Sequence, residues 1–335
     1  MKIIIDCMGG DKAPEETVKG AIQAARTFDA SISYVWVGNK NDIERIAKEE
    51  QFDLSRVEVV HADEVVTMED EPLTSVRAKP NSSMTVALRL LAEDGGDALV
   101  STCNTGALFT GATLLVRKVK GIQRAGIATV MPFDKPMLLF DSGANVEVTP
   151  ENLEQFAIVG SAYMKKMFGL ENPRVGLLNN GTEACKGTEL QQAAYRRLPD
   201  SPDVNFVGNI EGRDFLAGIA DVIVADGFSG NLILKTCEGV AGMMYGNLKQ
   251  VFKKNFISKI AAAMVMPGLK VFKKKMDYTE YGGAPLMGIA KPVIKAHGSS
   301  NAVAFKNALR QAKEYHDNKV VETIQKSITA LKEVE

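Results

Sequence analysis

The chain has 335 residues, of which 45% are hydrophobic and 24% are charged, and its formal net charge is −1 at pH 7. This length and composition are typical of a compact globular protein with a sizeable core, and they exclude a disordered, collagen-like or coiled-coil chain. Because 40 basic side chains are balanced by 41 acidic ones, no overall positive field attracts nucleic acid, and we expect no nucleic-acid partner.

The amino-terminal apolar run is short, since Asp6 follows only three isoleucines. It is too short for a signal peptide, and no other apolar run approaches the roughly 18 residues of a membrane span. We therefore expect a cytoplasmic protein. The cysteines are widely spaced without a C-x-x-C pair, so we expect reduced thiols and neither a disulfide framework nor a zinc site. They are Cys7, Cys103, Cys185 and Cys237.

Short apolar runs alternate with helical stretches along the whole chain. The clearest runs cover residues 2–6, 32–37, 57–60, 98–100, 137–140, 175–178 and 222–224. This alternation predicts parallel strands joined by helices. Because the runs are uniformly apolar, we expect helices on both faces of the sheet. The predicted fold is a three-layer α/β/α sandwich with a mostly parallel sheet, formed by residues 1–335 as a single large domain.

Five of these strands end in turns that combine glycine with asparagine or aspartate. Their sequences are IIIDCMGGD, ALVSTCNTGA, LLFDSGAN, GLLNNGTE and VIVADGFSGN. In open parallel sheets, ligands bind beyond the carboxyl ends of the strands, where small residues let backbone N–H groups approach an anion. We therefore expect a shared crevice at these strand ends. For any one turn, the alternative is that glycine, asparagine and aspartate are ordinary turn and capping residues.

Residues 239–276 form the sharpest change in composition, with eight lysines and no acidic residue. We predict that they form a protruding basic helical hairpin, broken at Pro267-Gly268. On a helical wheel one side is apolar, formed by Phe252, Phe256, Ile257, Ile260, Ala263 and Met264. The alternative is a helix that packs on the core and exposes a solvated lysine face.

Several familiar sites lack their motifs. Gly9-Gly10-Asp11 follows the first strand, where a dinucleotide fingerprint would place G-x-G-x-x-G. The segment GTEACKGT at 181–188 has its lysine and second glycine in the wrong order for a P-loop, and GFSG at 227–230 lacks the spacing of a nucleophile elbow. The histidines form no spaced ligand pair, so we expect no metal and no cofactor. They are His61, His297 and His316.

Eight ordered motifs cover the chain nearly from end to end. They are DCMGGDKAP at 6–14, NSSM at 81–84, NTGA at 104–107, DSGAN at 141–145, GTE at 181–183, DGFSGN at 226–231, YGGA at 281–284 and KAHGSS at 295–300. In this order they resemble the motifs of the PlsX family of bacterial phosphate acyltransferases. The departures are small: Cys7 and Cys103 stand where we expect alanine or another small residue, and Ala184-Cys185 stands where charged residues are common.

The resemblance implies an enzyme that converts an acyl-[acyl-carrier protein] and inorganic phosphate into an acyl phosphate, the donor for glycerol-3-phosphate acylation in bacterial phospholipid synthesis. It also implies a homodimer whose α/β/α fold is similar to those of isopropylmalate dehydrogenases and phosphate acetyltransferases. The family that it resembles uses no metal.

This chemistry depends on positioning and charge stabilisation, because phosphate is already an anionic nucleophile and the parent thiol of the leaving group has a pKa of about 8.5. We predict Lys186 as the cation, Asn231 as a donor, and His297 as a donor or proton carrier. The alternatives are a solvated surface lysine for Lys186 and a packed structural histidine for His297.

Other residues near the same turns receive two kinds of prediction. Glycines and small polar residues are candidates for phosphate binding, namely Gly9, Gly10, Asn104, Thr105, Gly106, Gly227 and Gly230. Carboxylates repel phosphate, so we expect four of them to brace turns or cap helices, namely Asp6, Asp11, Asp141 and Asp226.

The predicted hairpin fits either an anionic membrane surface or the carrier protein, and we predict reversible, peripheral association with the inner face of the cell membrane. The contact residues would be Phe252, Phe256, Ile260, Met264, Lys253, Lys254 and Lys259.

Two functions of other classes stay open. One is a dehydrogenase of the same broad fold, and the other is a lipid- or carrier-binding protein without catalysis.

Overall fold

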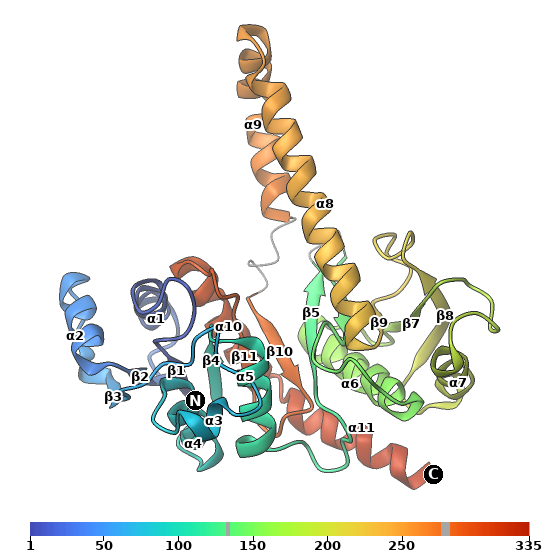
Figure 1. Cartoon of the computed structure of the whole chain (residues 1–335), viewed down its shortest axis with the longest axis horizontal. Helices are drawn as coiled ribbons and strands as arrows, with labels where there is room; N and C mark the ends of the chain where they lie inside the picture. Colours follow the sequence, from blue (N-terminus) through green and yellow to red (C-terminus); the bar gives the residue numbers. More distant parts are fainter. Residues whose placement is uncertain (132–134, 276–281, 335) are drawn as a thin grey trace.

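The computed structural model describes residues 1–131, 135–275 and 282–334, and it describes their side chains except those of residues 269–275 and 334. Met276, the predicted end of the hairpin, and Tyr281, the start of the YGGA motif, lie outside the described residues. Within the described part, strands from both ends of the chain form one mixed sheet in the order β3-β2-β1-β4-β11-β10-β5-β6-β9-β7-β8 (Figure 1).

The strands are β1 (Lys2–Asp6), β2 (Ser33–Gly38), β3 (Val57–His61), β4 (Ala98–Ser101), β5 (Gly126–Met131), β6 (Met137–Phe140), β7 (Arg174–Asn179), β8 (Asn205–Glu211), β9 (Val222–Val224), β10 (Ala284–Met287) and β11 (Val293–Lys295). The α-helices are α1 (Glu15–Thr27), α2 (Lys40–Glu49), α3 (Ser75–Ala78), α4 (Ser83–Ala92), α5 (Thr105–Gly111), α6 (Pro150–Phe168), α7 (Glu189–Arg197), α8 (Gly227–Lys253), α9 (Phe256–Lys275), α10 (Ala302–Asp317) and α11 (Val320–Val334).

The sheet is mostly parallel, as predicted. Antiparallel pairing joins β11 to β10, β10 to β5, and β5 to β6, while the strands on either side of this centre pair in parallel. The amino-terminal strands β1 to β4 and the strands β6 to β9 therefore form two parallel halves. The antiparallel centre was not predicted, because β5, β10 and β11 were not recognised as strands.

Apolar side chains are buried on both faces of the sheet. In β1, Ile3 and Ile5 belong to a cluster that includes residues of α1, α6, α10 and α11. Ile4 points to the other face and belongs to a cluster with residues of α4 and α5. The uniformly apolar sequence of β1 is explained by this burial on both sides, since alternate residues of a strand face opposite directions.

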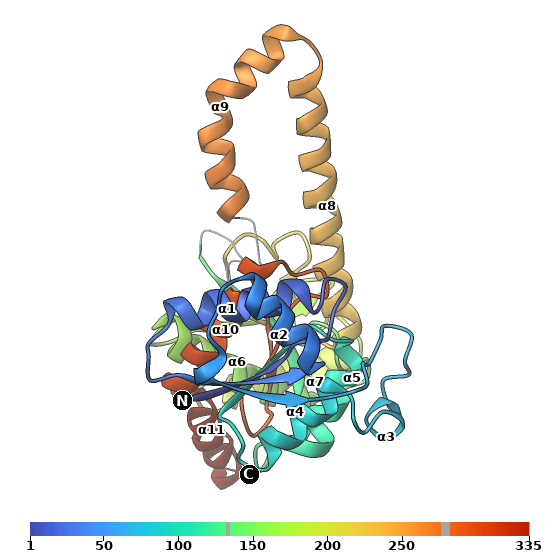
Figure 2. The ribbon, with the colours of Figure 1, turned by 90° about the vertical axis from the view of Figure 1, so that its left-hand side faces the viewer.

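Helices α8 and α9 stand away from the rest of the molecule (Figures 1 and 2). The structure corrects three details of the predicted hairpin. Its first helix begins at Gly227, well before residue 239; the chain turns after Lys253, which places Phe252 on a different helix from Phe256; and α9 continues through Pro267, where a break was expected. No helix of the described part has the length and hydropathy needed to span a bilayer.

Candidate active site

The carboxyl ends of β1, β4 and β11 meet at one edge of the sheet, because these neighbouring strands run parallel. Asp6 ends β1, and its buried carboxylate accepts hydrogen bonds from the Ser101 hydroxyl at 2.6 Å and from the Met8 N–H at 3.2 Å. The Cys103 N–H donates to the Ser101 oxygen at 3.1 Å. Burial raises the pKa of Asp6, and its hydrogen bonds act in the opposite direction. Asp6 therefore braces these turns, as predicted.

Glycines let the turns after these three strands pack closely. A Cβ atom on Gly9 would lie 2.6 Å from the Cys103 nitrogen, and one on Gly10 would lie 2.8 Å from the Gly298 carbonyl oxygen. The Asp11 N–H donates to the same Gly298 carbonyl at 2.9 Å. The carboxylate of Asp11 makes no hydrogen bond within the described residues, so its predicted bracing role is not confirmed. Phosphate binding by Gly9 and Gly10 stays a prediction.

The NTGA motif begins α5. Asn104 caps this helix, since its side-chain oxygen accepts the Ala107 N–H at 3.1 Å, and its amide nitrogen reaches the Met68 carbonyl at 3.5 Å. Thr105 is exposed, and Gly106 lies where a Cβ atom would come 2.9 Å from the side chain of Pro72. The side chain of Asn104 is thus engaged in the fold, and phosphate binding by this motif stays a prediction.

Lys295 ends β11 and is paired with Ser101 of β4. Its side chain is buried, and its ammonium donates to the carbonyl oxygens of Thr102, at 3.4 Å, and Ala296. Burial lowers the pKa of Lys295, although nearby acidic groups oppose this shift. Sequence reasoning missed this residue. It belongs to the KAHGSS motif, but no predicted strand placed it inside the sheet.

His297 follows Lys295 on the same turn, and it is an exposed residue although its ring is partly desolvated. The Nδ1 atom accepts the Ser299 N–H at 3.2 Å and lies 2.8 Å from the Ser299 hydroxyl. Because Nδ1 accepts a backbone N–H, the neutral ring carries its proton on Nε2. Burial lowers the pKa of His297, and the charges of Lys295 and Lys235 lower it further. His297 therefore presents a neutral Nε2–H donor near pH 7.

The effect of Lys235 on His297 links two distant parts of the chain. Lys235 and Glu238 lie in α8, which follows β9, whereas His297 follows β11. Their charges act on the imidazole, so the early turns of α8 lie near the turn after β11. We call the turns after β1, β4 and β11 the first wall, and the turns after β6 and β9 the second wall. The three antiparallel pairings from β11 to β6 reverse the strand direction, so the second wall lies at the opposite edge of the sheet, and the predicted crevice shared by all five turns is not confirmed.

Asp141 organises the second wall. Its carboxylate is fully buried and accepts hydrogen bonds of 2.7–3.1 Å from four backbone N–H groups and one side-chain amide. The donors are the N–H groups of Ile127, Gly143, Ala144 and Asn145 and the side chain of Asn145. Asp141 therefore braces the turn after β6, as predicted.

The start of α8 packs against this turn. The side chain of Asp226 caps the helix, as predicted, and the Gly227 N–H donates to the Asn145 carbonyl at 2.7 Å. A Cβ atom on Gly230 would lie only 1.9 Å from the Asp141 carbonyl oxygen. Gly227 and Gly230 thus permit backbone contact between α8 and the turn after β6, and phosphate binding by them stays a prediction.

Asn231 and Lys186 are both exposed. Asn231 lies one residue beyond Gly230 in α8, beside Gly143 of the second wall. Lys186 lies on the turn after β7, where its aliphatic stem covers Gly181, and its ammonium makes no hydrogen bond within the described residues. The charges of Lys235 and Glu238 in α8 influence His297, but no hydrogen bond or ion pair joins Lys186 to His297 or Asn231 in the described part. Their catalytic roles stay predictions.

The cysteines at the first wall are not suited to nucleophilic attack. Cys7 and Cys103 are buried. Burial raises the pKa of Cys103 to about 12, and it also raises the pKa of Cys7 well above its usual value. Since the thiolate is the nucleophilic form of cysteine, neither side chain is activated.

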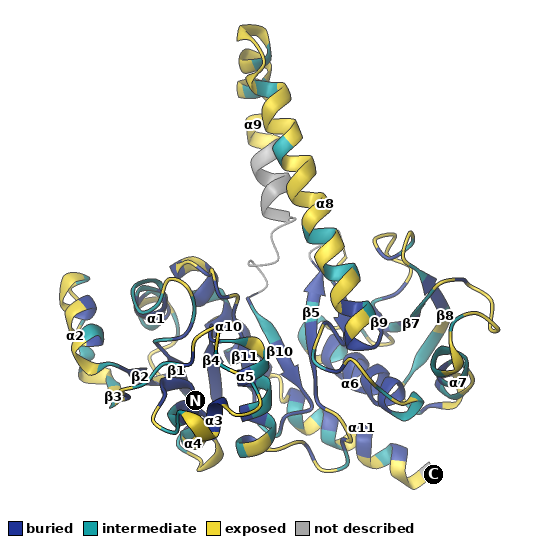
Figure 3. Cartoon of the chain, viewed as in Figure 1, coloured by how far each residue is buried: buried dark blue, intermediate teal, exposed yellow. Residues whose placement is uncertain are grey.

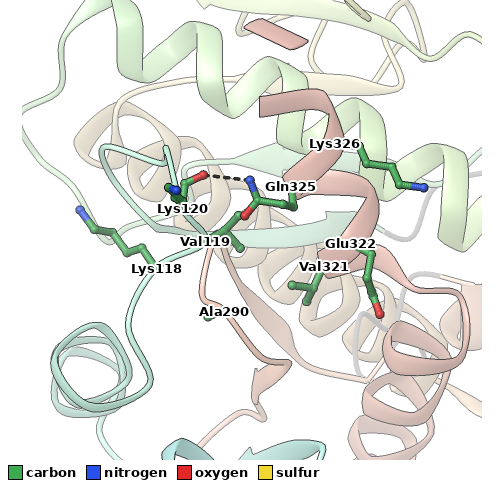
Figure 4. A pocket seen from close by; sticks show the side chains of 8 residues that line it. All are labelled: Lys118, Val119, Lys120, Ala290, Val321, Glu322, Gln325 and Lys326. Carbon is green, nitrogen blue, oxygen red and sulfur yellow. Dashed lines mark hydrogen bonds between the residues drawn. The ribbon is translucent and has the colours of Figure 1, made fainter. Parts of the chain in front are cut away.

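A cavity of about 410 Å³ lies between α11 and the segment that precedes β5 (Figure 4). It is bordered by Ala290, which precedes the amino end of β11, whereas His297 follows the carboxyl end of that strand. Its lining contains none of the predicted site residues. The lining residues are Lys118, Val119, Lys120, Ala290, Val321, Glu322, Gln325 and Lys326.

Comparison with known proteins identifies the family. A model of the "Fatty acid synthesis protein" family matches residues 1–323. The phosphate acyltransferase of Alkaliphilus oremlandii is 47% identical over 332 residues, which cover 99% of this chain and 98% of that protein. The chain belongs to the phosphate acyltransferase family. The phosphate acyltransferase of Thermoanaerobacter pseudethanolicus is 45% identical over the same length. The chain is therefore an acyltransferase.

Solved structures support the fold. A phosphotransacetylase from Streptococcus pyogenes superposes with a TM-score of 0.63 at 18% identity, covering 96% of this chain and 94% of that one. A branched-chain phosphotransacylase from Enterococcus faecalis gives a TM-score of 0.53 at 16% identity, covering 94% and 98%. These similarities establish the mixed, mostly parallel α/β architecture. The expected likeness to isopropylmalate dehydrogenases stays a prediction.

Proposed function

We propose that this chain transfers an acyl group from acyl-[acyl-carrier protein] to inorganic phosphate, producing acyl phosphate for bacterial phospholipid synthesis. The observation that carries the proposal is the position of His297, whose neutral ring carries its proton on Nε2, on the turn after β11 in a member of the phosphate acyltransferase family. Such a site offers donors to two anions, phosphate and the oxyanion of the reacting carbonyl, without an activated protein nucleophile.

In the proposed step, a phosphate oxygen attacks the thioester carbonyl carbon. A C–O bond forms, and the carbonyl electron pair moves onto its oxygen. When the tetrahedral intermediate collapses, the C–S bond breaks and the carrier leaves as a thiolate, which takes a proton from solvent. Neither end needs a strong acid or base, because the parent thiol has a pKa of about 8.5. Holding both reactants together and stabilising the oxyanion provides the catalysis.

Three exposed side chains receive roles in this step. The Nε2–H of His297, on the turn after β11, and the side-chain amide of Asn231, near the start of α8, donate hydrogen bonds to the oxyanion. Lys186 balances the charge of phosphate, since its ammonium is not used elsewhere within the described residues. The small residues of the strand ends admit phosphate close to the backbone.

Phosphorus NMR of the complete reaction tests the proposal. Purified protein, acyl-[acyl-carrier protein] and phosphate are combined with EDTA and without a nicotinamide, and an acyl phosphate signal is expected. Omission of phosphate is the control and should abolish thiol release. Binding of the carrier without any turnover would support a binding protein without catalysis, and activity lost in EDTA but restored by a metal would contradict the expected metal independence.

We also propose that the tip of the α8–α9 pair, where the chain turns between Lys253 and Phe256, rests on an anionic membrane surface. The protein would then be cytoplasmic and peripherally bound to the inner face of the cell membrane. Figure 3 shows that both helices are largely exposed where described. Phe256 and Met264 are 76% and 78% exposed, which would be costly for apolar side chains without a partner. Lys253, Lys254 and Lys259 lie beside the tip and would meet anionic headgroups.

The part of α8 between the tip and the sheet suggests a second partner. Its exposed large apolar side chains include those of Val240, Met243, Met244 and Leu248. A second copy of the chain would cover them, and we propose a homodimer built on this segment, with residues 239–276 as an excursion from one large domain. The carrier protein would then dock elsewhere or through lysines alone.

A further inference from the structure

Lys295 is a buried cation without an ion-pair partner in the described part of the chain. Its side chain is 7% exposed. Its ammonium has three N–H donors, and two of them reach the backbone carbonyls of Thr102 and Ala296. The third donor has no acceptor among the described residues. Removing a charged group from water is costly unless an opposite charge compensates it.

The acidic groups around Lys295 do not supply that compensation by contact. Asp6 and Asp11 act on Lys295 through space, but neither forms an ion pair with it within the described residues. The Asp6 carboxylate is already used by Ser101 and by the Met8 N–H. The Asp11 side chain is exposed to solvent. An anion bound beside the ammonium would neutralise its charge and accept a hydrogen bond from its third N–H.

The position of Lys295 indicates which anion would bind beside its ammonium. The residue ends β11 two positions before His297, and its charge reaches the imidazole of His297. The same wall carries the glycine turns after β1 and β4. If the proposed function holds, the small anion that must lie beside the thioester is phosphate.

We propose that Lys295 binds the transferring phosphate, as a cation distinct from Lys186. Lys295 belongs to the rigid wall of β1, β4 and β11, whereas Lys186 lies on an exposed turn after β7. A buried ammonium holds phosphate more strongly than an exposed one, because water screens it less. Lys295 therefore determines the affinity for phosphate, and the carrier protein binds without it.

The test compares Lys295→Met with Lys291→Met. Lys291 precedes the amino end of the same strand and forms an ion pair with Asp94 at 2.6 Å, so it is a matched lysine at the opposite edge of the sheet. Steady-state kinetics are measured against phosphate and against acyl-[acyl-carrier protein]. Lys295→Met is expected to raise the KM for phosphate at least about tenfold, the effect of one lost charged contact, with the KM for the acyl carrier nearly unchanged. Lys291→Met is expected to change neither constant.

A measurement on the wild-type protein covers the case in which Lys295→Met does not fold. Cyanate carbamylates free amines, and the modification of Lys295 and Lys291 is followed by mass spectrometry with phosphate or with chloride at equal ionic strength. Phosphate should slow modification of Lys295 severalfold and leave Lys291 unaffected.

Two results would overturn the inference: an unchanged KM for phosphate in folded Lys295→Met, or the absence of phosphate protection in the wild type. If the wild type makes acyl phosphate while either result is obtained, only the role of Lys295 fails. If the wild type makes no acyl phosphate, the proposed function itself fails.

Discussion

Lys186 and Asn231 are exposed side chains at different strand ends, so each can be removed without disturbing the core. We expect Lys186→Ala and Asn231→Ala each to lower kcat at least about a hundredfold, as loss of one oxyanion donor does in other enzymes, with folding intact. Lys48→Ala is the matched control, since Lys48 is also an exposed lysine and lies in the last turn of α2. Wild-type kinetics in folded Lys186→Ala would leave this lysine as a solvated surface residue.

The lowered pKa of His297 predicts a pH dependence of stability. Burial and two lysine charges oppose protonation of this ring in the folded state, while the unfolded ring has a pKa of about 6.5. Below about pH 6.5 the unfolded state therefore binds more protons than the folded state. Neutral His297 contributes fully to stability above that pH, and this contribution is lost as the pH falls.

His297→Gln should accordingly lose less stability than the wild type between pH 7 and pH 5. Urea unfolding at a series of pH values measures this difference, and His316→Gln is the control for removal of a histidine elsewhere. Equal slopes in the wild type and His297→Gln would mean that the pKa of His297 is not lowered in the folded protein.

Individual residues of the site were predictable to different degrees. The bracing by Asp141 and the cap by Asp226 were predicted, because each follows an apolar strand and precedes a helix, where such side chains satisfy free N–H groups. Lys295 was missed, because its burial depends on β11, a strand of three residues that pairs with β4 from the other end of the chain. Short strands of this kind carry too little periodicity to be read from sequence.

The docking of α8 on the turn after β6 depends on the absence of a side chain at Gly230. We expect Gly230→Ala to lower the free energy of unfolding by about 3 kcal/mol, because the new Cβ would lie 1.9 Å from a backbone oxygen that cannot rotate away. Gly239→Ala in the same helix is the matched control, since nothing lies within 4 Å of its Cβ position. It should leave stability unchanged or raise it by up to about 1 kcal/mol.

Urea denaturation of the two glycine variants gives the comparison. Equal stabilities would show that the turn after β6 moves to admit the methyl group, and that the start of α8 is not fixed by this contact.

The tip of α8 and α9 gives a prediction about membrane binding. We expect Ile260→Asp to release the protein from anionic vesicles, because a buried isoleucine contributes about 1.5–3 kcal/mol and each nearby lysine only about 1 kcal/mol. Acyl phosphate synthesis in solution should largely survive. Leu216→Asp is the control, since Leu216 is 50% exposed and Ile260 48% exposed, but Leu216 lies outside these helices. Unchanged vesicle co-sedimentation of Ile260→Asp would assign the apolar tip to another contact.

Among the elements, the buried parallel strands were predicted best. The runs at 2–6, 137–140 and 222–224 coincide with β1, β6 and β9. β10 was missed because Pro285 lies within it, and proline within a run argues against a strand. A helical hairpin was predicted in this region, but its break was placed at Pro267-Gly268 and not after Lys253. The wheel continued through Lys254 and Asn255 as though one helix were present.

The assembly of the two walls could not be read from local sequence. His297 and Lys235 influence each other although 62 residues separate them along the chain, and the order of the sheet places β10, β11 and β5 between the parallel halves. Five similar turns predicted one crevice, but long-range pairing decides which turns share an edge of the sheet. In the proposed function, donors from separate segments of the chain act at one place, where phosphate itself is the nucleophile.

Single-turnover chemistry tests this central claim most directly. Protein in excess is mixed with acyl-[acyl-carrier protein], and free carrier thiol, acyl phosphate and the intact mass of the protein are measured with and without phosphate. Direct transfer predicts that thiol is released only with phosphate, in a one-to-one ratio to acyl phosphate, and that the protein mass does not change. Release of thiol without phosphate, together with an acylated protein, would contradict it and would place a nucleophile on the chain itself.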